Sequence, residues 1–184
     1  MPLRRTMSLL AGLLVTLCLC GREVCSQELP GGKAPDGKLS LYNTHTFERL
    51  DVAFRDDNGD LDPTALAAIN RFLRCHFTNE VVPIDVRVIE LLDAIDDTLG
   101  GNRCIHIVSG YRSRGYNDRL RLVSKARGVA SRSLHLSGMA IDFRIPGIDS
   151  KGIHQVALDL RRGGVGYYSG SDFVHIDCGR PRSW

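Results

Sequence analysis

Two histidines and one aspartate, each in a strongly patterned stretch, constrain this sequence more than any other feature. His135 precedes Asp142 by seven residues, and His175 lies more than thirty residues further on, in the apolar stretch 173–177. Between residues 139 and 145, apolar side chains alternate with small or charged ones, which is typical of a half-buried β-strand. Asp142 is therefore expected to point away from the apolar layer.

His175 also stands at an alternating position, on the less apolar face of its own stretch. If the two stretches are neighbouring strands, His175 can lie opposite Asp142, at the spacing of about 5 Å that separates cross-strand pairs. Gly138 allows a tight turn, so the imidazole of His135 can fold back toward the same face. Two imidazoles and one carboxylate are the ligands of a catalytic zinc site that leaves one position open for water. The alternative is a hydrogen-bonded histidine–aspartate pair at the surface.

The motifs around these residues resemble a known family. They are S-x-H-x-x-G-x-A-x-D ending at Asp142, SGYRS at 109–113, GVGYY at 164–168 and FVHID at 173–177. Together they are similar to the periplasmic murein endopeptidases of the MepK type, in the superfamily of lysostaphin-like and D-Ala-D-Ala metallopeptidases that includes the hedgehog fold. The resemblance covers residues 39–184 and implies an α+β domain with a small central antiparallel sheet flanked by helices.

The same resemblance implies a zinc metallopeptidase that cleaves the peptide cross-links of peptidoglycan. One Zn²⁺ per chain would be held by His135, Asp142 and His175, and the substrates would be peptidoglycan stem peptides. Two alternatives stay open, a carboxypeptidase of the D-Ala-D-Ala type and a non-catalytic, zinc-containing wall-binding module. A monomer is the expected state.

The first 26 residues are expected to be a signal peptide for export to the periplasm or cell wall. A basic head at residues 1–5 precedes an apolar run from 7 to 20, which is too short for a confident membrane span. The head suits a general secretory signal and partly matches a twin-arginine signal. Residues 27–38, rich in glycine and proline, are expected to be a flexible linker.

Residues 39–184 have the size of one domain with one core. We expect two antiparallel strands within 39–54 near an Asp-Asn-Gly turn, a strand at 104–109 followed by a short helix, and a C-terminal hairpin of 165–168 with 173–177. Further helices are expected from Asp62 to about Arg74, from Asp85 to the glycines at 100–101, and from Asp149 to those at 163–164. The net charge of +3 is too small to indicate nucleic-acid binding.

Arg112 is the predicted substrate-binding residue. It lies in a basic segment, residues 103–132, that holds eight basic residues and a single acidic one. Most of these side chains are expected to form a solvated face. Arg112 differs because it follows a strand directly, at the position that faces the metal in related enzymes. Its guanidinium could hold a substrate carboxylate or carbonyl and stabilise an oxyanion.

The catalytic base is predicted to be Asp172, three residues before His175, where related enzymes carry a glutamate or aspartate. Strict alternation would turn Asp172 to the opposite face, so it reaches the metal only if the strand begins after it. Asp177 shares the face of His175 and is the second candidate, although it could serve instead as a partner of that imidazole.

The cysteines leave their pairing open. Outside the cytoplasm one disulfide can form among Cys25, Cys75, Cys104 and Cys178, but the sequence does not fix the partners.

Overall fold

The computed structural model describes residues 35–123 and 129–184. The expected signal peptide, most of the expected linker and Cys25 lie outside the described residues. The described part is an α+β domain, as expected. Among its helices, none has the length and apolar character needed to cross a membrane.

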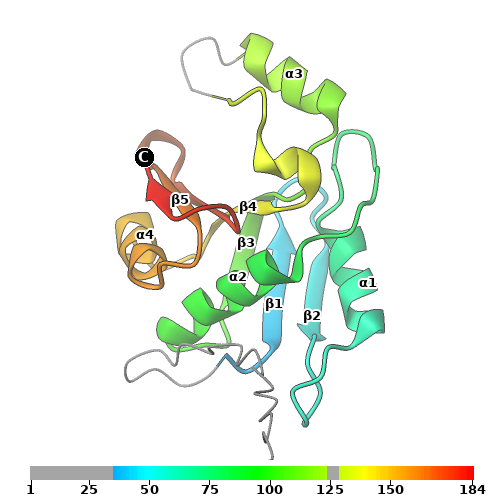
Figure 1. The fold of residues 1–184 in the computed structure, drawn as a ribbon, viewed down its shortest axis with the longest axis vertical. Helices are drawn as coiled ribbons and strands as arrows, with labels where there is room; N and C mark the ends of the chain where they lie inside the picture. Colours follow the sequence, from blue (N-terminus) through cyan, green and yellow to red (C-terminus); the bar gives the residue numbers. More distant parts are fainter. Residues whose placement is uncertain (1–34, 124–128) are drawn as a thin grey trace, which may run out of the picture.

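One mixed sheet of seven strands forms the centre of the domain (Figure 1). Its spatial order is β2-β1-β3-β4-β6-β5-β7. Most neighbours are antiparallel, as expected, but β1 pairs with β3, and β5 with β7, in parallel. The strands are β1 (Lys38–Asn43), β2 (Arg49–Ala53), β3 (Cys104–Ser109), β4 (Ala140–Arg144), β5 (Gly164–Tyr168), β6 (Phe173–Asp177) and β7 (Arg182–Ser183).

The helices begin where the sequence predicts. They are α1 (Pro63–Phe72), α2 (Val86–Thr98), α3 (Arg114–Val123) and α4 (Ser150–Asp159), with short 3₁₀ turns η1 (Leu134–Ser137) and η2 (Ser169–Ser171). Asp62, Asp85 and Asp149 each accept a hydrogen bond from a backbone N–H in the first turn of the helix that follows. The glycines at 163–164 do not end α4, because the helix already ends at Asp159 with Leu160 as its C-cap.

The opening hairpin forms, but its turn differs from the expected one. β1 and β2 pair antiparallel through the connection 44–48, in which Phe47 has a φ of 60°. The Asp-Asn-Gly turn lies one connection later, where it closes an isolated bridge between Arg55 and Leu61. In that turn the backbone N–H of Asp56 donates to the carbonyl of Asp60 over 2.9 Å.

The sheet separates the core from the polar site. Ile141 pairs with Ile176 and Phe143 with Val174, and all four of these side chains are fully buried in the core. Helix α2 contacts β6 on this apolar side, and α4 contacts α2, β5 and β6. Side chains that alternate with these project from the opposite face, on which η1 contacts β4. The three cysteines of the described residues are unpaired.

Candidate active site

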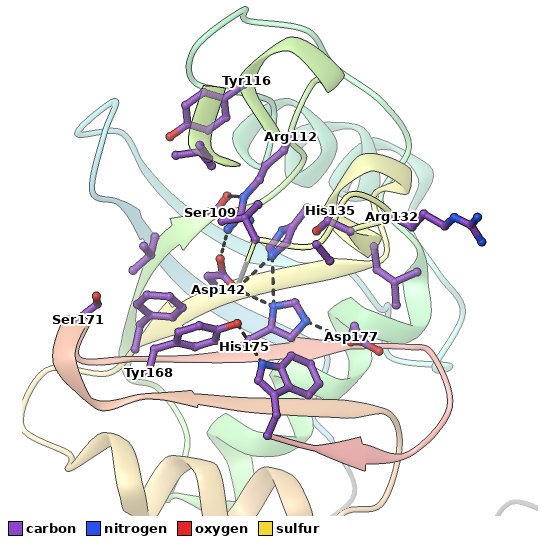
Figure 2. A pocket seen from close by; sticks show the side chains of 18 of the residues that line it. Ser109, Arg112, Tyr116, Arg132, His135, Asp142, Tyr168, Ser171, His175 and Asp177 are labelled. Carbon is purple, nitrogen blue, oxygen red and sulfur yellow. Dashed lines mark hydrogen bonds and ion pairs between the residues drawn. The ribbon is translucent and has the colours of Figure 1, made fainter. Parts of the chain in front are cut away.

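The predicted register between the two strands of the site is confirmed. Asp142 of β4 lies directly opposite His175 of β6. Both project from the face away from the helical core, and His135 approaches them from η1, so the three side chains turn toward one another (Figure 2). The structure thus brings together the three residues predicted to be metal ligands.

Two glycines and two hydrogen bonds fix His135. Gly138 ends η1 with a φ of 65°, and a Cβ there would come within 2.5 Å of the carbonyl oxygen of Pro83. The Nδ1–H of His135 donates to the carbonyl of Gly110 over 2.7 Å, while the carbonyl of His135 accepts from the backbone N–H of Arg112 over 3.1 Å. These reciprocal bonds join η1 to the end of β3 and direct Nε2 of His135 toward β4.

The donor atoms of the three side chains face one point. Nε2 of His135 lies 3.1 Å from Oδ1 of Asp142 and 3.2 Å from Nδ1 of His175, and this Nδ1 lies 2.7 Å from Oδ1. Atoms bound to one tetrahedral ion at about 2.0–2.1 Å lie about 3.4 Å apart. The cluster therefore needs only a small expansion to hold such an ion.

The outer nitrogens of both imidazoles determine which tautomer faces the cluster. Nδ1 of His135 meets a carbonyl and must carry its proton, so Nε2 presents a lone pair. The Nε2 of His175 lies 3.1 Å from Oδ2 of Asp177, which places the proton there and a lone pair on Nδ1. With the carboxylate of Asp142, three electron donors converge, and a cation satisfies all three at once.

Electrostatics within the cluster keep two of its three donors, His135 and Asp142, in metal-binding form. Burial, and then the charge of Arg112, lower the pKa of His135 to about 4, so this imidazole is neutral at pH 7. Burial alone would raise the pKa of Asp142, but His135 and Arg112 hold it well below its ordinary value. Burial lowers the pKa of His175, but its hydrogen bonds to Asp142 and Asp177 raise the pKa overall, so an ion at Nδ1 would have to displace a proton.

Asp177 holds His175 in place and is itself fully engaged. Its side chain is completely buried and forms a two-point ion pair with Arg182, with N···O distances of 3.0 and 2.6 Å. Oδ1 also accepts the backbone N–H groups of Gly164 and Gly179. Because every direction around this carboxylate is occupied, Asp177 suits the role of imidazole partner rather than that of base.

Removing the charge of Asp177 is therefore expected to weaken metal binding. In Asp177→Asn, the amide can no longer hold the Nε2–H of His175 and the guanidinium of Arg182 together. We expect Zn²⁺ affinity to fall about 10- to 100-fold, measured by competition with a chromogenic chelator. Asp159→Asn, which changes an exposed carboxylate at the end of α4, is the matched control. Unchanged affinity in Asp177→Asn would contradict this role.

A pocket of about 490 Å³ opens above the cluster. Arg112 lies on one side, where it pairs with Oδ2 of Asp142 and donates from Nε to Ser109 over 2.8 Å. Tyr168, Phe173 and Trp184 also line the pocket, where the ring of Tyr168 stacks on Phe173 and its hydroxyl accepts from the indole N–H of Trp184 over 3.0 Å. The predicted substrate-binding arginine thus lies within the pocket, in contact with the predicted metal ligand Asp142.

Asp172, the predicted base, is not brought to the cluster. It adopts a left-handed conformation with a φ of 48° after η2, and its Oδ1 accepts a 2.5 Å hydrogen bond from Ser150 at the start of α4. Its neighbours Ser171 and Phe173 both line the pocket, whereas Asp172 does not. Strand alternation does not govern Asp172, because β6 begins one residue after it. The left-handed backbone and the hydrogen bond from Ser150 hold its carboxylate instead.

Sequence reasoning did not identify the residues that complete the pocket. His45, Arg132, Arg182 and Trp184 line it, and the indole of Trp184 lies with its ring centroid 5.2 Å from that of His175. One sequence signal could have pointed to Trp184, namely the glycine within β5. Gly166 pairs with His175, and a Cβ there would approach the indole to 2.7 Å.

The fold, together with a group of two histidines and one aspartate that could hold a metal ion, is that expected of a metallohydrolase. The family model described as peptidoglycan L,D-endopeptidase MepK matches residues 33–184. Peptidoglycan L,D-endopeptidase MepK of Escherichia coli strain K12 is 41% identical over 146 residues, 79% of each chain. The probable peptidoglycan L,D-endopeptidase MepK of Haemophilus influenzae is 38% identical over 147 residues, 79% of this chain and 77% of the relative. The chain belongs to the MepK family of peptidoglycan endopeptidases.

Proposed function

We propose that this chain hydrolyses peptide cross-links of peptidoglycan with one bound Zn²⁺, and that the bond it cuts joins an L-configured to a D-configured residue. The names of the relatives support both the polymer and the stereochemistry. The observation that carries the proposal is the convergence of His135, Asp142 and His175 on one point at the floor of a pocket. Two imidazoles and one carboxylate suit Zn²⁺ and leave a fourth position open.

In the proposed reaction, the metal ion activates water and Arg112 stabilises the developing negative charge. A Zn²⁺ held by the three ligands would supply a Lewis acid that lowers the pKa of water to about 7. Arg112 faces the pocket beside Asp142, where its guanidinium can donate to the scissile carbonyl oxygen as negative charge develops. The same positive charge suits the free carboxylates of stem peptides.

We also propose Asp172 as the base that takes the proton of the attacking water and returns it to the leaving amine. Asp172 has an exposed side chain and lies three positions before His175. Both of its neighbours in the sequence line the pocket. To act, the carboxylate must leave Ser150 and rotate toward the pocket. Such rearrangements are compatible with an apo structure, because catalytic hydrogen bonds often tighten only when substrate binds.

Comparison of Asp172→Asn with Ser150→Ala tests this role. If Asp172 is the base, Asp172→Asn lowers kcat about 100-fold with Zn²⁺ still bound, and the acidic limb of the pH–rate profile is lost. Ser150→Ala releases the carboxylate and leaves kcat within a few-fold of wild type. Equal losses of kcat in both variants would instead mean that the hydrogen bond between Asp172 and Ser150 only stabilises the conformation of the η2 turn.

Digestion of purified muropeptide dimers decides between the proposed activity and its alternatives. Dimers joined through an L,D bond and dimers joined through a D,D bond are incubated separately with the Zn²⁺-loaded protein, and products are identified by mass spectrometry. We expect monomers from the L,D-linked dimers. Release of a terminal D-alanine alone would indicate the carboxypeptidase, and binding to sacculi without cleavage would indicate the wall-binding module.

The export of the chain is a further part of the proposal. The relatives are enzymes of peptidoglycan, and residues 1–26 have the composition of a signal peptide. We therefore propose a monomeric periplasmic protein that has lost this segment. The mass of the protein recovered from the periplasmic fraction measures the cleavage site, and recovery of the full-length mass would contradict it.

A further inference from the structure

Four carboxylates gather far from the active site, where the chain enters the domain. Asp36 lies just before β1, while Asp93, Asp96 and Asp97 occupy the last two turns of α2. Carboxylate oxygens of Asp36, Asp93 and Asp97 all lie within 4.8 Å of one another. Asp93 is buried, and the other two are half-buried.

The placement of these aspartates contradicts the local rules for helices. Asp93 and Asp97 are four residues apart, so they lie on one face of α2 and repel each other. All three helical aspartates lie near the C-terminus of α2, where the helix dipole disfavours negative charge. The last turn of α2 contains no basic residue to offset them. Local rules broken at one place usually mark a function.

Backbone N–H groups satisfy only part of this charge. Gly37 donates to Oδ2 of Asp93 over 3.0 Å, Asp36 to Oδ2 of Asp97 over 2.7 Å, and Lys38 to Oδ1 of Asp36 over 3.0 Å. The second oxygen of Asp93 is buried without any partner, in a residue that is 1% exposed. A buried carboxylate oxygen without a partner is costly, and metal coordination is one of the few ways to satisfy it.

No basic side chain of the described residues forms an ion pair with the cluster, although the charge of Arg103 acts on Asp96. Arg103 is close, but its guanidinium donates twice to the carbonyl of Leu99. Among the ion pairs formed by residues 35–123 and 129–184, none involves a carboxylate of this cluster. Burial, and then the charges of Asp97 and Asp36, raise the pKa of Asp93 to about 7.

We propose that Asp36, Asp93 and Asp97 bind one hard divalent cation, with Ca²⁺ preferred. The donors are all oxygens, which Ca²⁺ and Mg²⁺ favour, and the site lacks the nitrogen or sulfur ligands that Zn²⁺ selects. Ca²⁺ tolerates an irregular set of carboxylates completed by water, whereas Mg²⁺ demands near-octahedral geometry. The ion would clamp the segment before β1 onto α2, the helix that packs against β6 beneath the active site.

Calcium titration of the Zn²⁺-loaded full chain tests the proposal. Protein freed of metal and reloaded with one equivalent of Zn²⁺ is titrated with CaCl₂ at constant ionic strength. Calorimetry is expected to show one further ion per chain. Tm is expected to rise by about 5–10 °C once Ca²⁺ reaches about 100 times its Kd. A wild-type protein with neither binding heat nor a shift in Tm overturns the proposal.

Asp97→Asn, with Asp57→Asn as its control, tests whether Ca²⁺ binds at this cluster or elsewhere. Without Ca²⁺, Asp97→Asn should be at least as stable as wild type, because one repelling charge is gone, and it should not respond to Ca²⁺. Asp57→Asn, in an exposed turn, should keep the full response. If the carboxylates only cap backbone N–H groups, Asp97→Asn lowers Tm with or without Ca²⁺. A full Ca²⁺ response in Asp97→Asn would place the ion elsewhere, and either result overturns the proposal.

Discussion

Replacement of His135 by alanine is expected to eliminate both Zn²⁺ binding and hydrolysis. The imidazole is 1% exposed and supplies one of only three converging donors, so its loss leaves a carboxylate and one histidine. Removing a single oxyanion donor typically costs about 10²–10³ in kcat, and losing the whole metal centre should cost at least about 10³. Zinc content by elemental analysis and cleavage of L,D-linked dimers measure the two effects.

His154→Ala is the matched control for His135→Ala. His154 lies on α4, outside the pocket that contains the metal cluster, so this variant should keep one Zn²⁺ and full activity. Circular dichroism of both variants distinguishes loss of the ion from loss of the fold. A folded His135→Ala protein that still carries one Zn²⁺ would falsify the assignment of the metal site.

The central part of the site could be predicted from sequence because strand alternation is a strict rule. A one-residue change of register moves every side chain of a strand to the other face. The apolar positions of β4 and β6 therefore fixed which way Asp142 and His175 point. Their direct pairing in the sheet follows once the two strands are neighbours. Helix starts were predictable for a similar reason, since each capping aspartate acts through a local hydrogen bond.

Features that depend on backbone turns or on distant segments were not predictable. The position of Asp172 depends on a left-handed residue after η2 and on Ser150, which is twenty-two residues away. Local alternation could not place Asp172, because β6 begins one residue after it, and it could not supply the partner. Trp184 reaches His175 only because β7 pairs with β5 at the sheet edge. Such contacts join segments that are distant in the sequence, so local residue patterns do not predict them.

The second large effect is expected from Arg112→Ala. The side chain is 13% exposed and lies between Asp142 and the pocket, so it can stabilise the oxyanion as well as orient the ligand carboxylate. We expect kcat on L,D-linked dimers to fall about 10²–10³-fold at saturating Zn²⁺. Arg112→Lys should recover little of this loss, because an ammonium group cannot reproduce the fork that contacts both Ser109 and Asp142.

Arg132→Ala is the control that distinguishes the effect of the position of Arg112 from the effect of removing one positive charge. Arg132 lines the same pocket and is exposed, so its loss removes the same formal charge without touching Asp142. Its effect should be confined to a modest rise in KM, since exposed charges steer substrate more than they stabilise the transition state. If Arg112→Ala weakens Zn²⁺ binding yet keeps wild-type kcat once Zn²⁺ is saturating, Arg112 only positions Asp142. A fall in kcat at saturating Zn²⁺ would show that Arg112 stabilises the transition state.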